Sequence, residues 1–338
     1  MKIEKDFQKI TLKEFEVSNT SSLTFPGATP GKEWKVKDFK KALKIKAVRK
    51  EEMELEFDLI GVDPSFANAI RRILLSEVPS MAIEKVYMYN NTSIIQDEVL
   101  AHRLGLIPLK ADHRLFAWKS ADSDDLGTEH DTLEFELKVK CKKWPEAPEE
   151  SDNPKDLYEN SSVYTSQMTW NPKGGQASRL SDPGPVHDDI LLSKMRPGHE
   201  MDIKMYAYKG LGRDHAKFSP VATASYRLLP EITINEPVYG EAAERLQSCF
   251  SAGVIRLEGS KRKAVVDDAR YDACSRNVFR YDDLKDKVTL NKVRDHFIFT
   301  VESVGALEPE DLVLQALDVL EAKCDYFLEE LSTAEATS

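Results

Sequence analysis

The sequence is poor in cysteine and has no hydrophobic run long enough to cross a membrane. Its four cysteines, Cys141, Cys249, Cys274 and Cys324, lie too far apart for a C-x-x-C metal half-site. They are also too sparse for a disulfide framework in a chain of this size. The first twenty residues carry scattered charge and no apolar segment, so we expect no secretory signal. These absences favour the reducing interior of the cell.

An excess of positive charge is missing as well. Lys and Arg number 47 and Asp and Glu 58, which gives a net charge of −11. Proteins that bind nucleic acid without sequence preference neutralise phosphates with cations, so this chain is a poor candidate for that class. Its 338 residues are 41% hydrophobic and 31% charged, which is typical of a globular protein of about two domains.

Motifs of known catalytic and metal sites are absent. The sequence has no phosphate-binding G-x-x-x-x-G-K-[ST], no nucleophile G-x-S-x-G and no zinc-binding H-E-x-x-H. Gly210 and Gly212 form a lone G-x-G without the third glycine of a dinucleotide site. Asp122 and Asp124 resemble the start of a calcium loop, but Leu133 stands where its glutamate is required. We therefore expect no metal, no cofactor and no catalysis, although an enzyme with an unrecognised site stays an alternative.

Periodic patterns predict a mixed α+β fold. Residues 1–40 are polar and patternless, which predicts a surface arm. Alternating apolar and polar residues predict half-buried strands, and these cover residues 43–47, 53–59, 133–141, 201–207, 232–234 and 297–301. A helix is expected over residues 240–250. Loop-like composition between the middle strands indicates a loop-rich β domain over residues 80–220.

Two further helices are predicted in the first third of the chain. Asp63 can cap the first helix and Pro64 suits its first position, because a proline there lacks only an N–H that would be unpaired anyway. Pro79 ends this helix, whose apolar side chains recur at helical spacing: Phe66, Ile70, Ile73 and Leu74. The second helix should run over residues 97–104 and stop at Gly105.

The last predicted helix, over residues 309–331, is broadly apolar. Apolar side chains recur along it at alternating intervals of four and three residues and form a seam of the kind that packs along another helix. The residues of this seam are Val313, Leu317, Leu320, Cys324, Phe327 and Leu331. Leu312, Ala316 and Val319 widen this seam. Periodicity alone favours a helix whose one stripe faces its own sheet. The width nevertheless makes a second packing partner plausible.

Three clusters of cations invite a functional interpretation. Arg71 and Arg72 lie on the first helix, and His102 and Arg103 end the second. From the residues alone, all four are solvated charges near helix C-termini. The range Lys32 to Lys50 holds nine basic residues and is the basis of an alternative, a nucleic-acid-binding module. The acidic residues that follow cancel much of its field.

Four segments carry a resemblance to a known family. They are FANAIRRILLSEVP at 66–79, DEVLAHRLGLIP at 97–108, DHAKFSPVATASYRLLP at 214–230 and RDHFIFTVES at 294–303. The first resembles the α-motif of RNA polymerase α-like subunits, and the second a hallmark of the eukaryotic and archaeal members. The third resembles the form in the larger α-like subunit shared by RNA polymerases I and III. The resemblance spans about residues 41 to 331.

The resemblance implies a polymerase α N-terminal-type fold. A discontinuous dimerisation domain of residues 41–79 and 221–338 would carry an inserted β-rich domain of residues 80–220, after the arm of residues 1–40. The ten helix residues Phe66, Ile70, Ile73, Leu74, Val313, Leu317, Leu320, Cys324, Phe327 and Leu331 would bind the small α-like subunit.

The resemblance also implies a role. The chain would be a non-catalytic scaffold of RNA polymerases I and III in the nucleus and nucleolus, supporting rRNA, 5S rRNA and tRNA transcription. Arg71, Arg72, His102 and Arg103 would dock the second-largest subunit. Some relatives hold a cysteine cluster with a metal in the inserted domain, but this sequence offers only Cys141 there, so no metal is expected. We expect neither sequence-specific contact with DNA nor association with a membrane.

Overall fold

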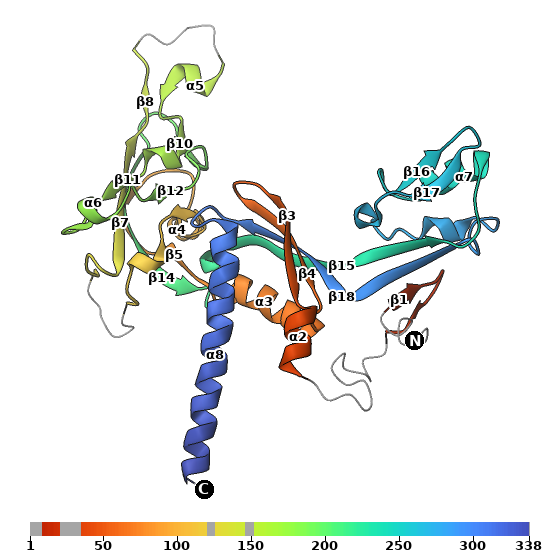
Figure 1. The fold of residues 1–338 in the computed structure, drawn as a ribbon. Helices are drawn as coiled ribbons and strands as arrows, with labels where there is room; N and C mark the ends of the chain where they lie inside the picture. The colour runs from red at the N-terminus through yellow and green to blue at the C-terminus, as the bar shows by residue number, and fades with distance from the viewer. Residues whose placement is uncertain (1–8, 21–34, 120–125, 146–151, 338) are drawn as a thin grey trace. The chain divides into compact units, whose positions relative to one another are not determined.

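The computed structural model describes residues 9–20, 35–119, 126–145 and 152–337. As far as they are described, these residues form two compact units. The first unit comprises Met1–Lys50, Leu55–Ala69 and Ser225–Thr300, and the second comprises Glu51–Glu54, Ile70–Ala224 and Val301–Ser338. Helices and strands alternate irregularly in both (Figure 1), which confirms the predicted α+β class.

A six-stranded sheet is the framework of the first unit, although three of its strands, β4, β15 and β18, have residues at one end that belong to the second. Five strands lie in the order β2-β1-β18-β4-β3, and β15 also pairs with β18. Their bounds are β1 (Lys9–Leu12), β2 (Val17–Ser18), β3 (Lys44–Lys50), β4 (Glu54–Ile60), β15 (Val221–Ile234) and β18 (Val288–Ser303). The sequence predicts only the last residues of β15 and the later part of β18. The remainder of each strand lacks strict alternation, so periodicity alone cannot delimit it.

The described part of residues 1–40 is not a patternless arm. β1 pairs antiparallel with β18 and places Leu12, 7% exposed, in the core of the first unit. The helix α2 (Val36–Ala42) begins before the expected boundary at residue 40. A four-residue strand carries little periodic signal, and its partner lies far away in the chain, which explains why sequence reasoning missed it. The prolines and glycines at 26–31 lie outside the described residues.

The burial predicted from alternation is observed in β4 but not in β3. Leu55, Phe57 and Leu59 of β4 are buried, as their alternation with acidic residues predicts. All seven residues of β3 are exposed, including Ile45 at 60%, so its prediction as a half-buried strand is wrong. β3 is the edge strand of the sheet, and its alternating pattern does not reveal that position.

Around this sheet the first unit adds short elements that complete its core. These are α7 (Gly240–Ser248), β16 (Ile255–Glu258), β17 (Lys263–Val266) and the 3₁₀ turns η4 (Ala269–Tyr271) and η5 (Asn277–Arg280). β16 and β17 form a hairpin, and α7 buries Ala243 and Leu246 in the same core. The helix predicted over residues 240–250 is confirmed, two residues shorter.

The helix α3 (Pro64–Ser76) forms as its sequence predicts. The Ser65 backbone N–H donates a hydrogen bond of 2.8 Å to Asp63 Oδ1, which satisfies one of the unpaired donors at the helix start. After the helix, the Glu77 and Val78 N–H groups both donate to the Ile73 carbonyl. The chain then passes directly into a strand at Pro79.

A four-stranded sheet in the order β11-β7-β14-β5 is the framework of the second unit. Its strands are β5 (Pro79–Asn91), β7 (Thr132–Lys140), β11 (Thr169–Asn171) and β14 (Glu200–Leu211). β7 and β14 match the predicted alternation and pair antiparallel, with Phe135 opposite Met205 and Leu137 opposite Ile203. β5 is a strand that the sequence analysis does not predict, because its apolar residues do not alternate regularly over its length.

Shorter elements surround this sheet. They are α4 (Asp97–Gly105), β6 (Leu109–Lys110), η1 (His113–Leu115), β8 (Lys142–Lys143), α5 (Pro154–Leu157), β9 (Tyr158–Glu159), β10 (Ser162–Tyr164), η2 (Thr165–Gln167), α6 (Gln176–Arg179), β12 (Gly184–Pro185), β13 (Leu191–Lys194) and η3 (Ala216–Phe218). α4 confirms the second predicted helix and buries Leu100 and Leu104 against the sheet. The loop-rich β character expected of the middle of the chain is therefore observed among its described residues.

Close packing explains the lone G-x-G motif. A Cβ on Gly210 would lie 2.6 Å from the Phe218 ring, and one on Gly212 would lie 2.2 Å from the Leu75 carbonyl oxygen. Both separations are shorter than real Cβ contacts, so only glycine fits. Gly210 in β14 and Gly212, one residue after this strand, let the chain approach its neighbours closely here. They need no phosphate ligand to account for them.

The last element, α8 (Pro309–Thr337), is a single helix that reaches the C-terminus (Figure 1). It extends six residues beyond the predicted end. No helix among the described residues is both long and apolar enough to span a membrane. The predicted division into residues 41–79 and 221–338, with an insertion of residues 80–220, remains a prediction.

Candidate dimerisation surface

The start of α8 is fixed by its sequence and by one neighbouring cation. Pro309 occupies the first position, and Glu310 and Asp311 stand in the first turn, where carboxylates are favoured by the helix dipole. Arg114 Nη2 lies 3.3 Å from Asp311 Oδ2. The hydrogen bond that Arg114 also makes to Asp112 raises the pKa of its guanidinium, so this group stays cationic.

The first half of α8 packs against its own chain. Leu312 and Ala316 are 0% exposed, and Val313, Leu317 and Leu320 are partly buried. This half therefore behaves as a helix with one covered stripe, which is the arrangement that periodicity alone favours.

The second half of α8 is exposed on its whole circumference. Every residue from 321 to 334 is exposed. The predicted seam continues here with Cys324, Phe327 and Leu331, and the two larger side chains are 62% and 60% exposed. Apolar side chains at such spacing on an otherwise polar helix are typical of a surface that packs along another helix.

Sequence analysis missed one member of this surface, which we call the distal seam and define as Cys324, Phe327, Leu328 and Leu331. Leu328 is 65% exposed and follows Cys324 by four residues, one turn along the same face. Its signal was present in the sequence, but the four–three stepping used to trace the seam passes over it. Tyr326 is also exposed, at 57%, but helical geometry places it on the opposite face.

Of the predicted contact residues on α3, only Phe66 is available at the surface. Its side chain is 45% exposed, and its ring lies 5.7 Å from that of Phe39. Ile70, Ile73 and Leu74 are 7%, 3% and 0% exposed. Their helical spacing therefore reflects burial within the chain itself, and direct contact of these three side chains with a partner stays a prediction.

The four predicted docking residues differ in their surroundings. Arg72 and His102 are exposed, and Arg71 is partly buried. Arg103 is exposed but tied to its own chain, because its Nη2 donates a hydrogen bond of 2.6 Å to the Leu191 carbonyl. His102 and Arg103 lie in the last turn of α4, as predicted, whereas the last turn of α3 contains no basic residue, so the expectation that Arg71 and Arg72 lie near a helix C-terminus is wrong. Which surfaces they serve stays a prediction.

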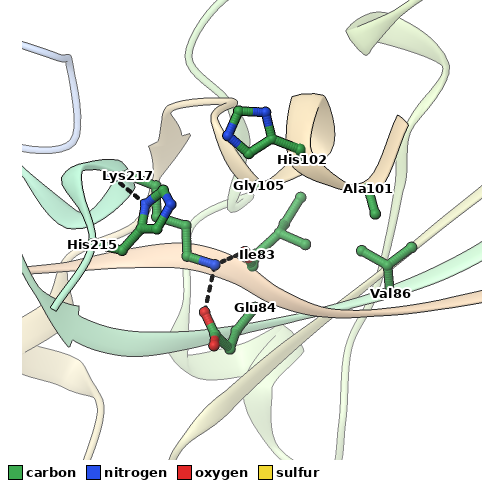
Figure 2. A pocket seen from close by; sticks show the side chains of 8 residues that line it. All are labelled: Ile83, Glu84, Val86, Ala101, His102, Gly105, His215 and Lys217. Atoms are coloured by element: carbon green, nitrogen blue, oxygen red, sulfur yellow. Dashed lines mark hydrogen bonds and ion pairs between the residues drawn. The ribbon is translucent and has the colours of Figure 1, made fainter. Parts of the chain in front are cut away.

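His102 borders a pocket of about 280 Å³ in the second unit. Figure 2 shows Lys217 reaching across this pocket, where its Nζ forms an ion pair with Glu84 and donates a hydrogen bond of 2.9 Å to the Ile83 carbonyl. The His215 ring lies 6.3 Å from that of His102, and its Nδ1 accepts a hydrogen bond from the Lys217 backbone N–H. The cation is thus already satisfied, and the two exposed imidazoles are the polar groups left at the rim.

The four cysteines differ in their exposure to solvent. Cys141 and Cys249 are buried, Cys274 is partly buried and Cys324 is exposed, and all four are free thiols. Burial raises the pKa of the Cys141 thiol, which disfavours the thiolate that a metal requires. The described residues bring together no group of three or more His, Cys, Asp or Glu side chains suited to a metal ion.

Comparison with known proteins gives consistent matches. A family model described as the RNA polymerase Rpb3/Rpb11 dimerisation domain matches residues 56–324. The chain is 52% identical to the DNA-directed RNA polymerases I and III subunit RPAC1 of Mus musculus, over 97% of this chain and 96% of that protein. It is 48% identical to the subunit of the same name from Saccharomyces cerevisiae, over 92% and 94%. It is 33% identical to the DNA-directed RNA polymerases IV and V subunit 3B of Arabidopsis thaliana, over 83% and 89%.

Proposed function

The chain belongs to the RNA polymerase Rpb3/Rpb11 dimerisation-domain family, within the group of subunits shared by RNA polymerases I and III, and on this premise we propose that it is a non-catalytic assembly subunit of these two enzymes. It pairs with the small α-like subunit and then docks the second-largest subunit. It works in the nucleus, including the nucleolus, and supports rRNA, 5S rRNA and tRNA transcription. Its contribution is mechanical, since it offers a surface and not a reacting group.

The single observation that carries this proposal is the exposed second half of α8. The distal seam includes three large apolar side chains, each at least 60% exposed. Burying each fully gains ~2 kcal/mol, or ~6 kcal/mol together. Association costs an estimated ~4–15 kcal/mol, so these residues start a stable interface but do not complete it. The partly buried Val313, Leu317 and Leu320 extend the same stripe toward the helix start.

Docking of the second-largest subunit is a separate part of the proposal. Arg72 and His102 are the predicted docking residues whose side chains are exposed and form no hydrogen bond or ion pair with another described residue. A guanidinium can bind carboxylate or carbonyl groups of a partner in bidentate fashion. Arg103 supports the site indirectly, because its bond to Leu191 fixes the end of α4.

The test is affinity purification of the full chain from cells. A variant with Phe327→Asp and Leu331→Asp places two charges in the distal seam without touching the core, since both side chains are exposed. It should lose the small α-like subunit and with it the other polymerase subunits. Tyr326→Asp, an exposed position on the opposite face of the same turn, is the matched control and should retain them. Recovery of the full set of subunits with the double variant would overturn the proposal.

One observation keeps a second function open. The eight basic residues between 35 and 50 are all exposed, as a nucleic-acid-binding module requires. Six acidic residues lie between 35 and 58, however, so the local net charge is only 8 − 6 = +2. Binding of isolated protein to DNA or RNA, weakening steeply with salt, would favour this alternative.

A further inference from the structure

The first unit contains a pocket of about 440 Å³, a volume typical of small-ligand sites. Its walls come from β15, from β18 and from the residues at and directly after η4, all within the first unit. We call it the η4 pocket. Leu228 and Pro230 give it an apolar wall, and the exposed Tyr271 also lines it. None of the predicted contact residues lines this pocket, so the proposed function does not account for it.

Two cations line the η4 pocket and have no ion-pair partner among the described residues. Arg227 from β15 is exposed, and Lys292 from β18 is partly buried. Neither side chain forms a hydrogen bond or an ion pair with another described residue. A neutral ligand that filled the pocket would remove water from both cations and offer no charge in return, which costs free energy. The pocket therefore favours a ligand that carries negative charge.

The buried carboxyl group of Asp272 limits the charge of that ligand. Asp272 is 7% exposed, and among the described residues it is the one acid that lines the pocket. Burial raises the pKa of this carboxyl, while a hydrogen bond from the Cys274 backbone N–H and the charges of Lys292 and Arg227 oppose the rise. With Asp272 ionised, the charges of the lining groups sum to 2 − 1 = +1. A single carboxylate balances this charge, whereas a phosphate of nearly two negative charges exceeds it.

The wall formed by residues 272–274 is held in place by the surrounding chain. Directly after it, Ser275 Oγ donates a hydrogen bond of 3.2 Å to the Cys249 carbonyl. Cys274 itself adopts a left-handed backbone conformation with a φ of 56°, which costs energy in a residue other than glycine and persists only where the surroundings impose it. A wall that is fixed in advance reduces the entropy lost when a ligand binds.

We propose that the η4 pocket is a carboxylate-binding site, in which Arg227 and Lys292 hold the side chain of one aspartate or glutamate from a partner protein. The guanidinium offers parallel N–H donors that match the two carboxylate oxygens, and the ammonium adds a point charge. Leu228 and Pro230 offer apolar contact to the stem of the bound side chain. The pocket shares no residue with the distal seam, so this inference does not depend on the proposed function.

Cys274 provides a reporter of occupancy, because its thiol lines the pocket and is partly buried. Purified full-length chain is treated with iodoacetamide, a neutral reagent, and alkylation of Cys274 is followed by mass spectrometry of the fragment that contains it. The probe is a capped tripeptide with one glutamate between two glycines. At about 10 mM and a dissociation constant of about 1 mM, it should slow alkylation roughly tenfold. The matched glutamine peptide at equal ionic strength should not, and equal rates with both peptides would overturn the proposal.

Two substitutions remove the cations one at a time. Arg227→Gln and Lys292→Met should each weaken binding of the glutamate peptide at least roughly tenfold, because each deletes a charge-assisted hydrogen bond. Lys287→Met removes the same charge from a partly buried lysine just before β18 and outside the pocket, and it should keep the protection. Burial raises the pKa of the Cys274 thiol and Lys292 opposes that rise, so alkylation rates are compared with and without peptide within each variant.

Melting temperatures show that each variant is folded. Arg227 is exposed, so Arg227→Gln should melt close to wild type and keeps the test decisive even if Lys292→Met is destabilised. Equal protection in Arg227→Gln, in the control variant and in wild type would overturn the assignment of the site.

Inorganic phosphate tests the charge balance in the pocket. At neutral pH and the same concentration, it should protect Cys274 at least roughly threefold less than the glutamate peptide, because it brings nearly two negative charges where one is balanced. Asp272→Asn removes the opposing carboxylate and keeps the shape of the side chain, so protection by phosphate should rise relative to protection by the peptide. Stronger protection by phosphate in wild type, or an unchanged ratio in Asp272→Asn, would overturn the choice of a carboxylate ligand.

Discussion

Lys323 Nζ lies 2.8 Å from one carboxylate oxygen of Glu77 and 2.9 Å from the other. Glu77 directly follows α3, so this bridge ties the middle of α8 to the segment that ends the first long helix. It stands at the change from the packed half of α8 to the exposed half. The bridge thus marks where the chain stops covering its own helix.

We expect this bridge to contribute little to stability. The Lys323 and Glu77 side chains are 48% and 27% exposed, so water screens the pair. Lys323→Met should reduce the free energy of unfolding by less than ~1 kcal/mol. Thermal melts at low and high salt check this, since the difference from wild type should shrink as salt rises. A loss of several kcal/mol would show that the bridge holds α8 in place.

Truncation of a leucine to alanine should destabilise the chain strongly in the first half of α8 and hardly at all in the second half. Leu312 is 0% exposed, so Leu312→Ala leaves a cavity and should cost ~2–5 kcal/mol. Leu331 is 60% exposed, so Leu331→Ala should change stability by less than ~0.5 kcal/mol. Melting temperatures of the full-length variants provide the measurement. A large loss with Leu331→Ala in the isolated chain would mean that the helix end is covered internally.

A buried charge cluster in the first unit should be sensitive to single substitutions. Arg270 lies 2.7 Å from Asp58 Oδ1 and 2.6 Å from Glu56 Oε1, and its side chain is 12% exposed. His296 Nε2 lies 3.3 Å from the other Asp58 oxygen. Arg270→Met leaves a buried carboxylate without its main cation and should cost ~3–5 kcal/mol.

A double-mutant cycle tests whether that cost comes from the pair. Arg270→Met leaves the Asp58 carboxylate without its cation, and Asp58→Asn removes that charge. The loss of unfolding free energy in the double variant should therefore be at least ~1 kcal/mol smaller than the sum of the losses in the two single variants. Chemical denaturation of all four proteins supplies the free energies. Strict additivity would contradict the view that the two side chains act together.

His113 should make the chain sensitive to acid. Its side chain is 6% exposed, and burial together with the nearby Lys209 lowers its pKa from 6.5 to about 4. Below pH 6.5 the unfolded chain takes up a proton that the folded chain refuses until about pH 4, so stability falls as the pH drops through this window. At ~1.36 kcal/mol for each pKa unit the loss is at most about 3 kcal/mol.

The neutral variant His113→Gln isolates this contribution. Its melting temperature should fall less than that of wild type between pH 6.5 and pH 4, and the two should run parallel above pH 6.5. Other groups titrate in the same window, so the informative quantity is the difference between the two curves. Parallel curves throughout would show that His113 is protonated without cost.

Sequence reasoning succeeded where a local pattern determines the local structure. Asp63 and Pro64 predicted the start of α3, and alternation predicted β7 and β14. It failed where the partner of a segment lies far away in the chain. The alternation of Ile45 with lysines is the same on an edge strand and on a covered one, so the exposure of β3 could not be read from it.

The site shows the same distinction. The four–three stepping on α8 predicted an apolar stripe but not the residue at which its cover ends, near Leu320. On α3, equal spacing made Phe66 and Leu74 look alike, although one is 45% exposed and the other 0%. Burial depends on the elements packed around a helix, which its own sequence does not specify.

The exposed end of α8 also has a consequence for the amount of this chain that a cell can maintain. A chain made in excess of its companion would keep an apolar surface open, and such surfaces lead to aggregation or to capture by chaperones and proteases. Surplus molecules would be removed and not stored. The scarcer of the two chains would then set how many complete assemblies can be built, whatever the rate of synthesis of the other.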